Sequence, residues 1–64
     1  MNEIGAIIKH RRQDLGVSQG TLAELAGVGI NTLVSIERGE GNPTLQVLMR
    51  ICDTLGLQIK IELK

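Results

Sequence analysis

The chain has 64 residues, a length that allows one small domain with a single core and no elaborate active-site cleft. With 42% hydrophobic and 22% charged residues it is globular in composition, and the absence of Phe, Trp and Tyr excludes the aromatic stacking on bases that many single-strand and RNA binders use. Seven basic and seven acidic residues give zero net charge, which counts against a general affinity for nucleic acid.

Two short helices are predicted in the first part of the chain. Asn2 can cap a helix whose apolar positions repeat at spacings of three and four up to Gly16, and Ser18 can cap a second helix that ends at Gly27. Both glycines fit the left-handed position after a helix, where a Cβ would be strained. The expected inward stripes are Ile4, Ile7, Ile8, Arg11 and Leu15 in the first helix and Leu22, Ala23 and Ala26 in the second.

Two further helices follow after a tight turn. A third helix is predicted over 30–38, and Gly39 ends it. Pro43 prevents its continuation, and Thr44 can cap a fourth helix that keeps the helical period up to Gly56. The expected inward positions are Leu33 and Ile36 in the third helix and Leu45, Leu48, Ile51, Cys52 and Leu55 in the fourth.

The last eight residues change the pattern from helix to strand. Apolar and polar residues alternate strictly over 57–64, which predicts a β-strand after a helical domain over 1–56. No second strand is predicted, and a lone strand is not stable, so we expect it to pair with the same strand of a second copy in a homodimer. The apolar side of the tail could instead fold back on its own core, which would leave the backbone unpaired. The expected dimerisation residues are Leu57, Ile59, Ile61 and Leu63.

No residue pattern indicates catalysis or metal binding. Cys52 lies on an apolar helical face and is interpreted as a small core residue, while His10 has no companion at ligand spacing. There is no paired nucleophile and base, so no enzyme activity, metal or cofactor is expected. The single cysteine fits a reducing compartment, and the first residues lack a long apolar run, so we expect a cytoplasmic protein that does not enter a membrane.

An ordered set of short motifs runs through residues 4–56. The motifs are Ser-Gln at 18–19, Leu-Ala at 22–23, Ala-Gly-Val at 26–28, Leu33, Ile-Glu-Arg-Gly at 36–39 and Asn-Pro-Thr-Leu at 42–45. In order and spacing this set resembles the helix-turn-helix of the lambda-repressor-like family (Xre, Cro/cI type). The predicted terminal strand is similar to that of HipB-type antitoxin repressors, which dimerise partly through such a strand.

The resemblance implies an all-α fold of four short helices, here with one added C-terminal β-strand, and a transcriptional regulator. The third helix would enter the major groove of double-stranded DNA, with a homodimer spanning two half-sites. Asn31 can form paired hydrogen bonds with adenine, whereas Ile30 and Val34 can pack on thymine methyl groups. By position in the family, the base-reading residues would be Gly29, Ile30, Asn31, Val34 and Ser35.

Phosphate contacts and one ion pair also follow from the resemblance. The positions that would face phosphates are Gln19, Arg38, Asn42 and Lys9. Arg12 and Glu37 match positions that pair in many members of the family, where they tie the first helix to the end of the third. We prefer a structural ion pair between Arg12 and Glu37 to a contact of either residue with DNA. In such a pair the two charges neutralise each other and do not contribute to the electrostatic field that faces the DNA.

Two functions of different class remain open from the sequence. The first is a sequence-specific DNA-binding repressor, with an antitoxin that binds a toxin protein as its more specific form. The second is a protein-interaction adaptor or toxin-neutralising module that keeps the helix-turn-helix scaffold without specific DNA reading. The neutral net charge favours the second function, as does an apolar patch of Ile30 and Val34 with Leu25 nearby.

Overall fold

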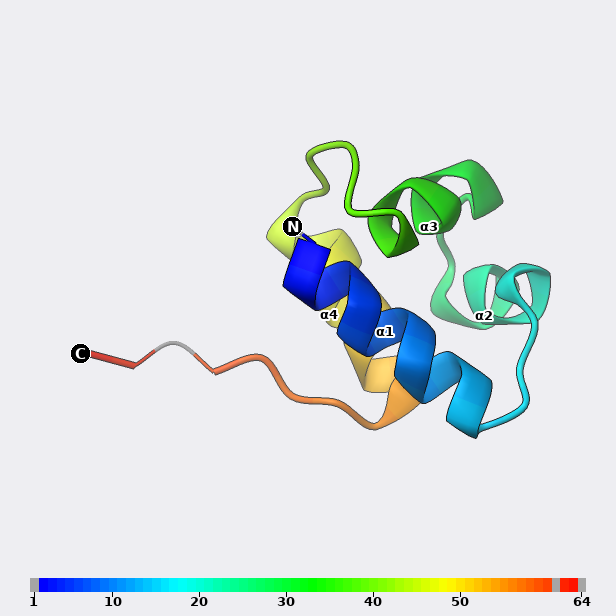
Figure 1. Cartoon of the computed structure of the whole chain (residues 1–64), viewed down its shortest axis with the longest axis horizontal. Helices are drawn as coiled ribbons and strands as arrows, with labels where there is room; N and C mark the ends of the chain where they lie inside the picture. Colours follow the sequence, from blue (N-terminus) through cyan, green and yellow to red (C-terminus); the bar gives the residue numbers. More distant parts are fainter. Residues whose placement is uncertain (1, 61, 64) are drawn as a thin grey trace.

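The computed structural model describes residues 2–60 and 62–63 and contains a four-helix domain followed by an extended tail (Figure 1). Helix α1 packs against α3 and α4, and α2 packs against the same two helices. The tail leaves the end of α4 on the side away from α2 and α3 (Figure 1). The all-α, four-helix prediction is confirmed. The helices are α1 (Asn2–Asp14), α2 (Gln19–Ala26), α3 (Ile30–Glu37) and α4 (Leu45–Leu55).

Side-chain caps start α2 and α4 where the sequence predicts them. The Ser18 hydroxyl accepts a hydrogen bond from the Thr21 backbone N–H at 3.0 Å, and the Thr44 hydroxyl accepts one from the Val47 N–H at 3.2 Å. Each bond satisfies one of the backbone donors that a helix leaves free at its first turn. The glycine that follows each of these helices has a left-handed conformation, with φ of 70° and 73°. Local sequence therefore sets the limits of both helices.

The core is entirely aliphatic, apart from one thiol. Cys52 is buried in it as a free cysteine, and burial raises the pKa of its thiol, so it stays protonated and packs as a small apolar side chain. The side chains with the least exposure are Ile8, Leu22, Leu33, Ile36 and Ile51.

The predicted inward stripe of α1 is wrong in part. Ile4, Ile7 and Leu15 are 39%, 56% and 47% exposed, and only Ile8 of the expected apolar residues is fully buried. The face of α1 that meets α3 includes Gly5 instead, which is buried. A Cβ built on Gly5 would overlap the carbonyl oxygen of Ile36 and lie 3.1 Å from its carbonyl carbon. The absence of a side chain lets α1 approach the backbone of α3, and this contact sets the rotation of α1 about its axis.

The first residue predicted for α4's stripe also lies outward. Leu45 is 52% exposed, whereas Leu48, Ile51 and Leu55 are buried. Leu45 is the first residue of the helix, just after its Thr44 cap, where the helix has not yet reached the core.

No strand is formed by the described part of the predicted strand, residues 57–60 and 62–63. A strand needs a hydrogen-bonding neighbour, and the rest of the described chain offers none. Leu57 packs against the core, and its N–H donates to the Cys52 carbonyl at 2.8 Å, so this first tail residue belongs to the end of α4. Farther out, Ile59 is 41% exposed and Leu63 is fully exposed. Ile61 lies outside the described residues.

Candidate nucleic-acid interface

Helices α2 and α3 form a corner that presents the first turn of α3. The turn begins with a hydrogen bond from the Val28 N–H to the Ala23 carbonyl at 3.0 Å, and Gly29 caps α3 through its backbone alone. Leu33 and Ile36 are buried on the inner face of α3. Because the helix is held by this inner face, its opposite face and its N-terminal end are free to meet a partner.

The five predicted base-reading residues divide into an open and a partly covered set. Gly29, Ile30 and Asn31 are exposed, with Ile30 at 49%, whereas Val34 and Ser35 are half-buried. Gly29, Ile30 and Asn31 lie at the N-terminal end of α3. In helix-turn-helix proteins, the N-terminal residues of the recognition helix are the ones that contact base edges.

A shallow groove of about 370 Å³ runs between α3 and the loop that precedes α4. It brings Asn31 and Ser35 together with Asn42, which the sequence assigned to a phosphate. Thr32 and Glu40 also line the groove, and neither was predicted. The sequence could have indicated Thr32, because it follows Asn31 on the exposed first turn of α3. Glu40 could not be predicted, because only the fold of the loop brings it to the groove. The lining consists of Asn31, Thr32, Ser35, Ile36, Glu40, Gly41, Asn42 and Pro43.

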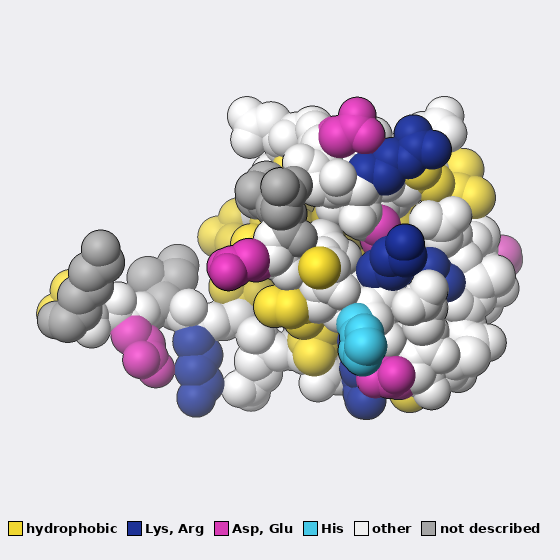
Figure 2. Space-filling view, viewed as in Figure 1, with side chains coloured by type: hydrophobic (Ala, Val, Ile, Leu, Met, Phe, Trp, Pro, Cys, Tyr) yellow, Lys and Arg dark blue, Asp and Glu magenta, His cyan; other side chains and the backbone are white. Residues whose placement is uncertain are grey.

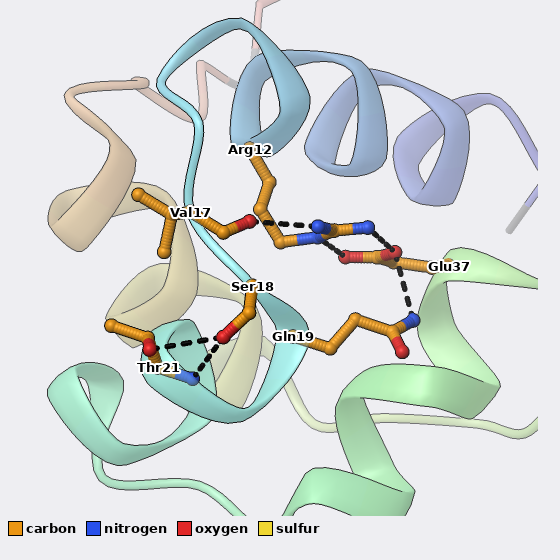
Figure 3. Close-up of polar contacts among 6 residues, drawn as sticks. All are labelled: Arg12, Val17, Ser18, Gln19, Thr21 and Glu37. Carbon is orange, nitrogen blue, oxygen red and sulfur yellow. Dashed lines mark hydrogen bonds and ion pairs between the residues drawn. The ribbon is translucent and has the colours of Figure 1, made fainter.

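Arg12 and Glu37 form a two-pronged ion pair between α1 and the last residue of α3 (Figure 3). The Arg12 Nε donates to Glu37 Oε2 at 2.7 Å, and its Nη2 donates to Oε1 at 2.9 Å. The side chains are 11% and 2% exposed. The hydrogen bond to Glu37 raises the pKa of Arg12, while burial opposes this rise, and the guanidinium remains charged. The third guanidinium nitrogen donates to the Val17 carbonyl at 2.8 Å, so the pair also ties down the turn before α2.

Gln19, the first residue of α2, joins this pair. Its side-chain Nε2 donates to Glu37 Oε1 at 3.1 Å, and the residue is half-buried (Figure 3). The neighbouring Gly20 is exposed, and the nearest atom to a Cβ built there is Ile30 Cδ1 at 3.8 Å. The sequence pointed to Gln19 as a phosphate contact but did not reveal its hydrogen bond to Glu37.

The remaining basic residues are dispersed. Lys9 is exposed on α1 and Arg38 is exposed at the end of α3. Arg11, which the sequence placed in the inward stripe, donates from Nε to the Leu55 carbonyl at 2.9 Å and so stabilises the end of α4. On the face drawn in Figure 2, basic and acidic side chains lie interspersed. This surface therefore has no extended basic area, in line with the zero net charge.

Within residues 2–60 and 62–63, no group of three His, Cys, Asp or Glu side chains is placed to hold a metal ion. None of the described helices has the length and apolar character needed to span a membrane. The chemistry at the α2–α3 corner is hydrogen bonding by amides and hydroxyls, with apolar contacts from Ile30 and one exposed guanidinium from Arg38.

Known proteins resemble this chain over most of its length. A family model described as Helix-turn-helix matches residues 8–61. An HTH-type transcriptional regulator of Methanothermobacter thermautotrophicus is 38% identical over 50 residues, which cover 78% of this chain and 72% of that regulator. One from Sinorhizobium fredii is 32% identical over 92% of this chain and 78% of its own length. One from Haemophilus influenzae is 40% identical over 78% of this chain and 51% of its own length, so this chain spans about half of that regulator.

Solved structures give the same result. The crystal structure of SinR, a master regulator for biofilm formation, in complex with DNA matches with a TM-score of 0.78 and 41% identity, over 86% of this chain and 89% of SinR's. A complex of SinR with the SinI protein matches equally well in fold, at 42% identity over 84% of this chain and 53% of that one. The clp gene regulator ClgR from Corynebacterium glutamicum matches with a TM-score of 0.78 and 33% identity, over 84% of this chain and 57% of ClgR's. The chain belongs to the helix-turn-helix transcriptional regulators of the Xre and Cro/cI type, a family of regulators and not of enzymes.

Proposed function

We propose that this chain is a sequence-specific DNA-binding repressor that inserts α3 into the major groove and acts as a homodimer. The observation that carries the proposal is the first turn of α3, which is open at Ile30 and Asn31 while Leu33 and Ile36 anchor the helix in the core. A major groove about 12 Å wide admits one helix presented in this way. The similarity to SinR, which has been solved with DNA, supports the proposal.

Base recognition depends on few side chains. Asn31 offers an amide that can pair with the N6 and N7 atoms of adenine, and Ile30 offers methyl groups for contact with thymine. Ser35 lies with Asn31 in the α3 groove and can donate or accept a hydrogen bond. Val34 is half-buried and contributes only the part of its side chain that faces outward. The operator should accordingly contain A·T pairs opposite the start of α3.

Phosphate contacts position the helix on the duplex. Gln19, Arg38, Asn42 and Lys9 are the residues proposed for them, and only two of these carry a positive charge. Because few counterions are released per subunit, binding should fall only gently with rising salt concentration. A homodimer doubles these contacts and adds a second half-site.

The Asn31→Ala variant tests the base-reading role. Loss of a bidentate contact to adenine removes about 1–3 kcal/mol of discrimination, so operator affinity should fall by roughly fivefold to more than 100-fold while affinity for scrambled duplex stays unchanged. The measurement is fluorescence anisotropy with DNA from upstream of the chain's own gene, at several salt concentrations. Gln13→Ala, at an exposed position on α1, is the matched control. Wild-type binding to upstream DNA that is no tighter than to scrambled duplex contradicts the proposed function.

The tail supports the proposed homodimer. Two grooves flank it, of about 550 Å³ beside α4 and about 270 Å³ beside α1. Both contain Leu57 and Ile59, and they add Leu45 and Met49 on one side and Ile4 and Ile7 on the other. Figure 2 shows apolar side chains gathered over α1, next to the base of the tail. A second copy would supply the missing strand partner and cover this surface.

The Ile59→Pro variant tests the pairing of tails. Proline removes a backbone N–H and cannot take part in a strand ladder at that position, so a dimer held by a two-stranded ribbon should dissociate to monomers. Light scattering coupled to size-exclusion chromatography measures the change. Ile59→Val, which keeps both the N–H and the β-branched side chain, should remain dimeric. A dimer that survives the proline variant would instead place the interface on the exposed faces of α1 and α4.

The exposed apolar residues of the α2–α3 corner favour a second candidate function. Leu25 is 67% exposed and Ile30 is 49% exposed, a patch that suits a protein partner. The similarity to SinR in its complex with SinI is compatible with such a partner. In this function the chain is an adaptor, or the antitoxin of a toxin protein encoded beside it. Replacing Asn31 and Arg38 with alanine separates the two functions, because an adaptor keeps its protein partner whereas a repressor loses its operator.

A further inference from the structure

We infer that Glu37 is a positioning residue that holds the side-chain amide of Gln19 ready for a DNA phosphate. The inference rests on the proposed phosphate contact of Gln19 and assigns a second role to a carboxylate that the family resemblance pairs only with Arg12. Glu37 itself is 2% exposed in its side chain and lies at the far end of α3, so its effect on DNA would pass through Gln19.

One oxygen of Glu37 serves two donors. Its Oε1 accepts from Arg12 Nη2 at 2.9 Å and from Gln19 Nε2 at 3.1 Å (Figure 3). The second oxygen, Oε2, accepts from Arg12 Nε at 2.7 Å. Arg12 is in turn held by the Val17 carbonyl at 2.8 Å. The carboxylate is therefore fixed by the planar guanidinium before it meets Gln19, and it joins α1, the start of α2 and the end of α3 at one point.

The chemistry of the carboxylate determines which way the Gln19 amide points. An ionised carboxylate can only accept hydrogen bonds, so the amide nitrogen of Gln19, and not its oxygen, must face Glu37. One N–H of Nε2 is used in that bond, and the other N–H remains available. A phosphate oxygen is also purely an acceptor, and the remaining N–H is the group that it requires. An unrestrained glutamine would present oxygen or nitrogen with equal ease.

The orientation reduces the entropy lost on binding. Glutamine has a long, flexible side chain that normally loses rotamer freedom when it contacts a ligand. Here the hydrogen bond to Glu37 restricts that freedom in the free protein. Gln19 is also the first residue of α2, beside the exposed Gly20, so a phosphate can approach the backbone N–H groups at the same place.

Side-chain amide NMR of the free wild-type chain tests the inference without DNA. The Gln19 NH₂ group should give heteronuclear NOE values typical of ordered groups. The exposed Gln13, Gln46 and Gln58 provide internal controls and should give values typical of mobile side chains. A Gln19 amide as mobile as these three would overturn the positioning role, whatever the chain binds.

A double-mutant cycle on duplex affinity tests the coupling. Gln19→Ala should weaken operator binding by about fivefold in the wild-type background. The factor should be less than about twofold in Glu37→Asp, whose shorter side chain keeps a charge for Arg12 but withdraws the oxygen from Gln19. Equal factors in both backgrounds would mean that Glu37 acts on the fold alone. All affinities are measured where circular dichroism shows each variant folded. If Glu37→Asp does not fold, the side-chain amide NMR of the wild-type chain still tests the positioning role.

The two tests separate this inference from the proposed function. If the wild-type chain binds no duplex, the proposed function fails and the inferred role in DNA binding fails with it, while the NMR result still reports whether Glu37 orders Gln19. If the chain binds its operator but the Gln19 amide is mobile, only the positioning role fails.

Discussion

Replacing Gly5 with alanine should destabilise the chain strongly. The new Cβ would overlap the backbone carbonyl oxygen of Ile36, and a backbone atom cannot move aside as a side-chain tip can. Helix α1 would have to shift away from α3, which also pulls Ile8 and Arg12 from their partners. Overpacking of this kind typically costs about 1–3 kcal/mol, and we expect the upper end of that range here. Thermal and urea unfolding followed by circular dichroism give the measurement.

Gly20→Ala is the matched control for Gly5→Ala. Both glycines are helical residues without positive φ, but Gly20 is exposed, and the nearest atom to its Cβ is 3.8 Å away. Alanine at an open helical position should stabilise the chain by about 0.5–1 kcal/mol. The two substitutions therefore have opposite expected signs. Equal effects from both would show that the contact between α1 and α3 has no special role in stability.

Replacing Glu37 with alanine should be the most damaging change to the polar network. It leaves Arg12, whose side chain is only 11% exposed in the folded chain, without its carboxylate partner. Removal of one member of a buried ion pair typically costs about 3–5 kcal/mol, because the other charge remains desolvated. The single core of a chain below about 70–80 residues rarely supplies more than about 3–5 kcal/mol, so the variant should be close to unfolding at ambient temperature. Urea denaturation at neutral pH measures the loss.

A double replacement provides the control for Glu37→Ala. Arg12→Met combined with Glu37→Met removes both charges and fills much of the same volume with apolar atoms. Such replacements of a whole buried pair are often neutral or stabilising, so the double variant should regain most of the stability that the single variant loses. A loss below about 1 kcal/mol in the single variant would instead be the behaviour of an exposed surface pair.

Local sequence was sufficient to predict the helices and the family. Ser18 and Thr44 cap α2 and α4 through hydrogen bonds to backbone groups three residues away, and the glycines after these helices adopt the left-handed conformation. These interactions involve only neighbours in the chain, so their residue types and spacing reveal them. The apolar period over Leu48, Ile51, Cys52 and Leu55 predicted the buried face of α4 for the same reason. The ordered motifs around the α2–α3 corner then pointed to the family.

The tertiary structure alone decided which face of α1 is buried. Periodicity predicted a stripe of Ile4, Ile7, Ile8, Arg11 and Leu15. Ile8 is buried, but Ile4, Ile7 and Leu15 are each more than a third exposed. A period shows that a helix has an apolar side, whereas the orientation of that side depends on what the helix meets. For α1 the deciding contact is the backbone of α3 at Gly5, a residue with no side chain to contribute to a hydrophobic pattern.

Two further polar contacts between distant residues were beyond the reach of sequence pattern. Gln19 and Glu37 are 18 positions apart, and Arg11 and Leu55 are 44 apart, with no spacing rule to connect either pair. Only the packing of α2 against α3 and of α1 against α4 brings them within hydrogen-bond distance. The tail shows that a correct local pattern is not sufficient for a strand. Its alternating residues satisfy the local requirement for a strand, but a strand is completed by its neighbour, and the described residues of one chain contain no such neighbour.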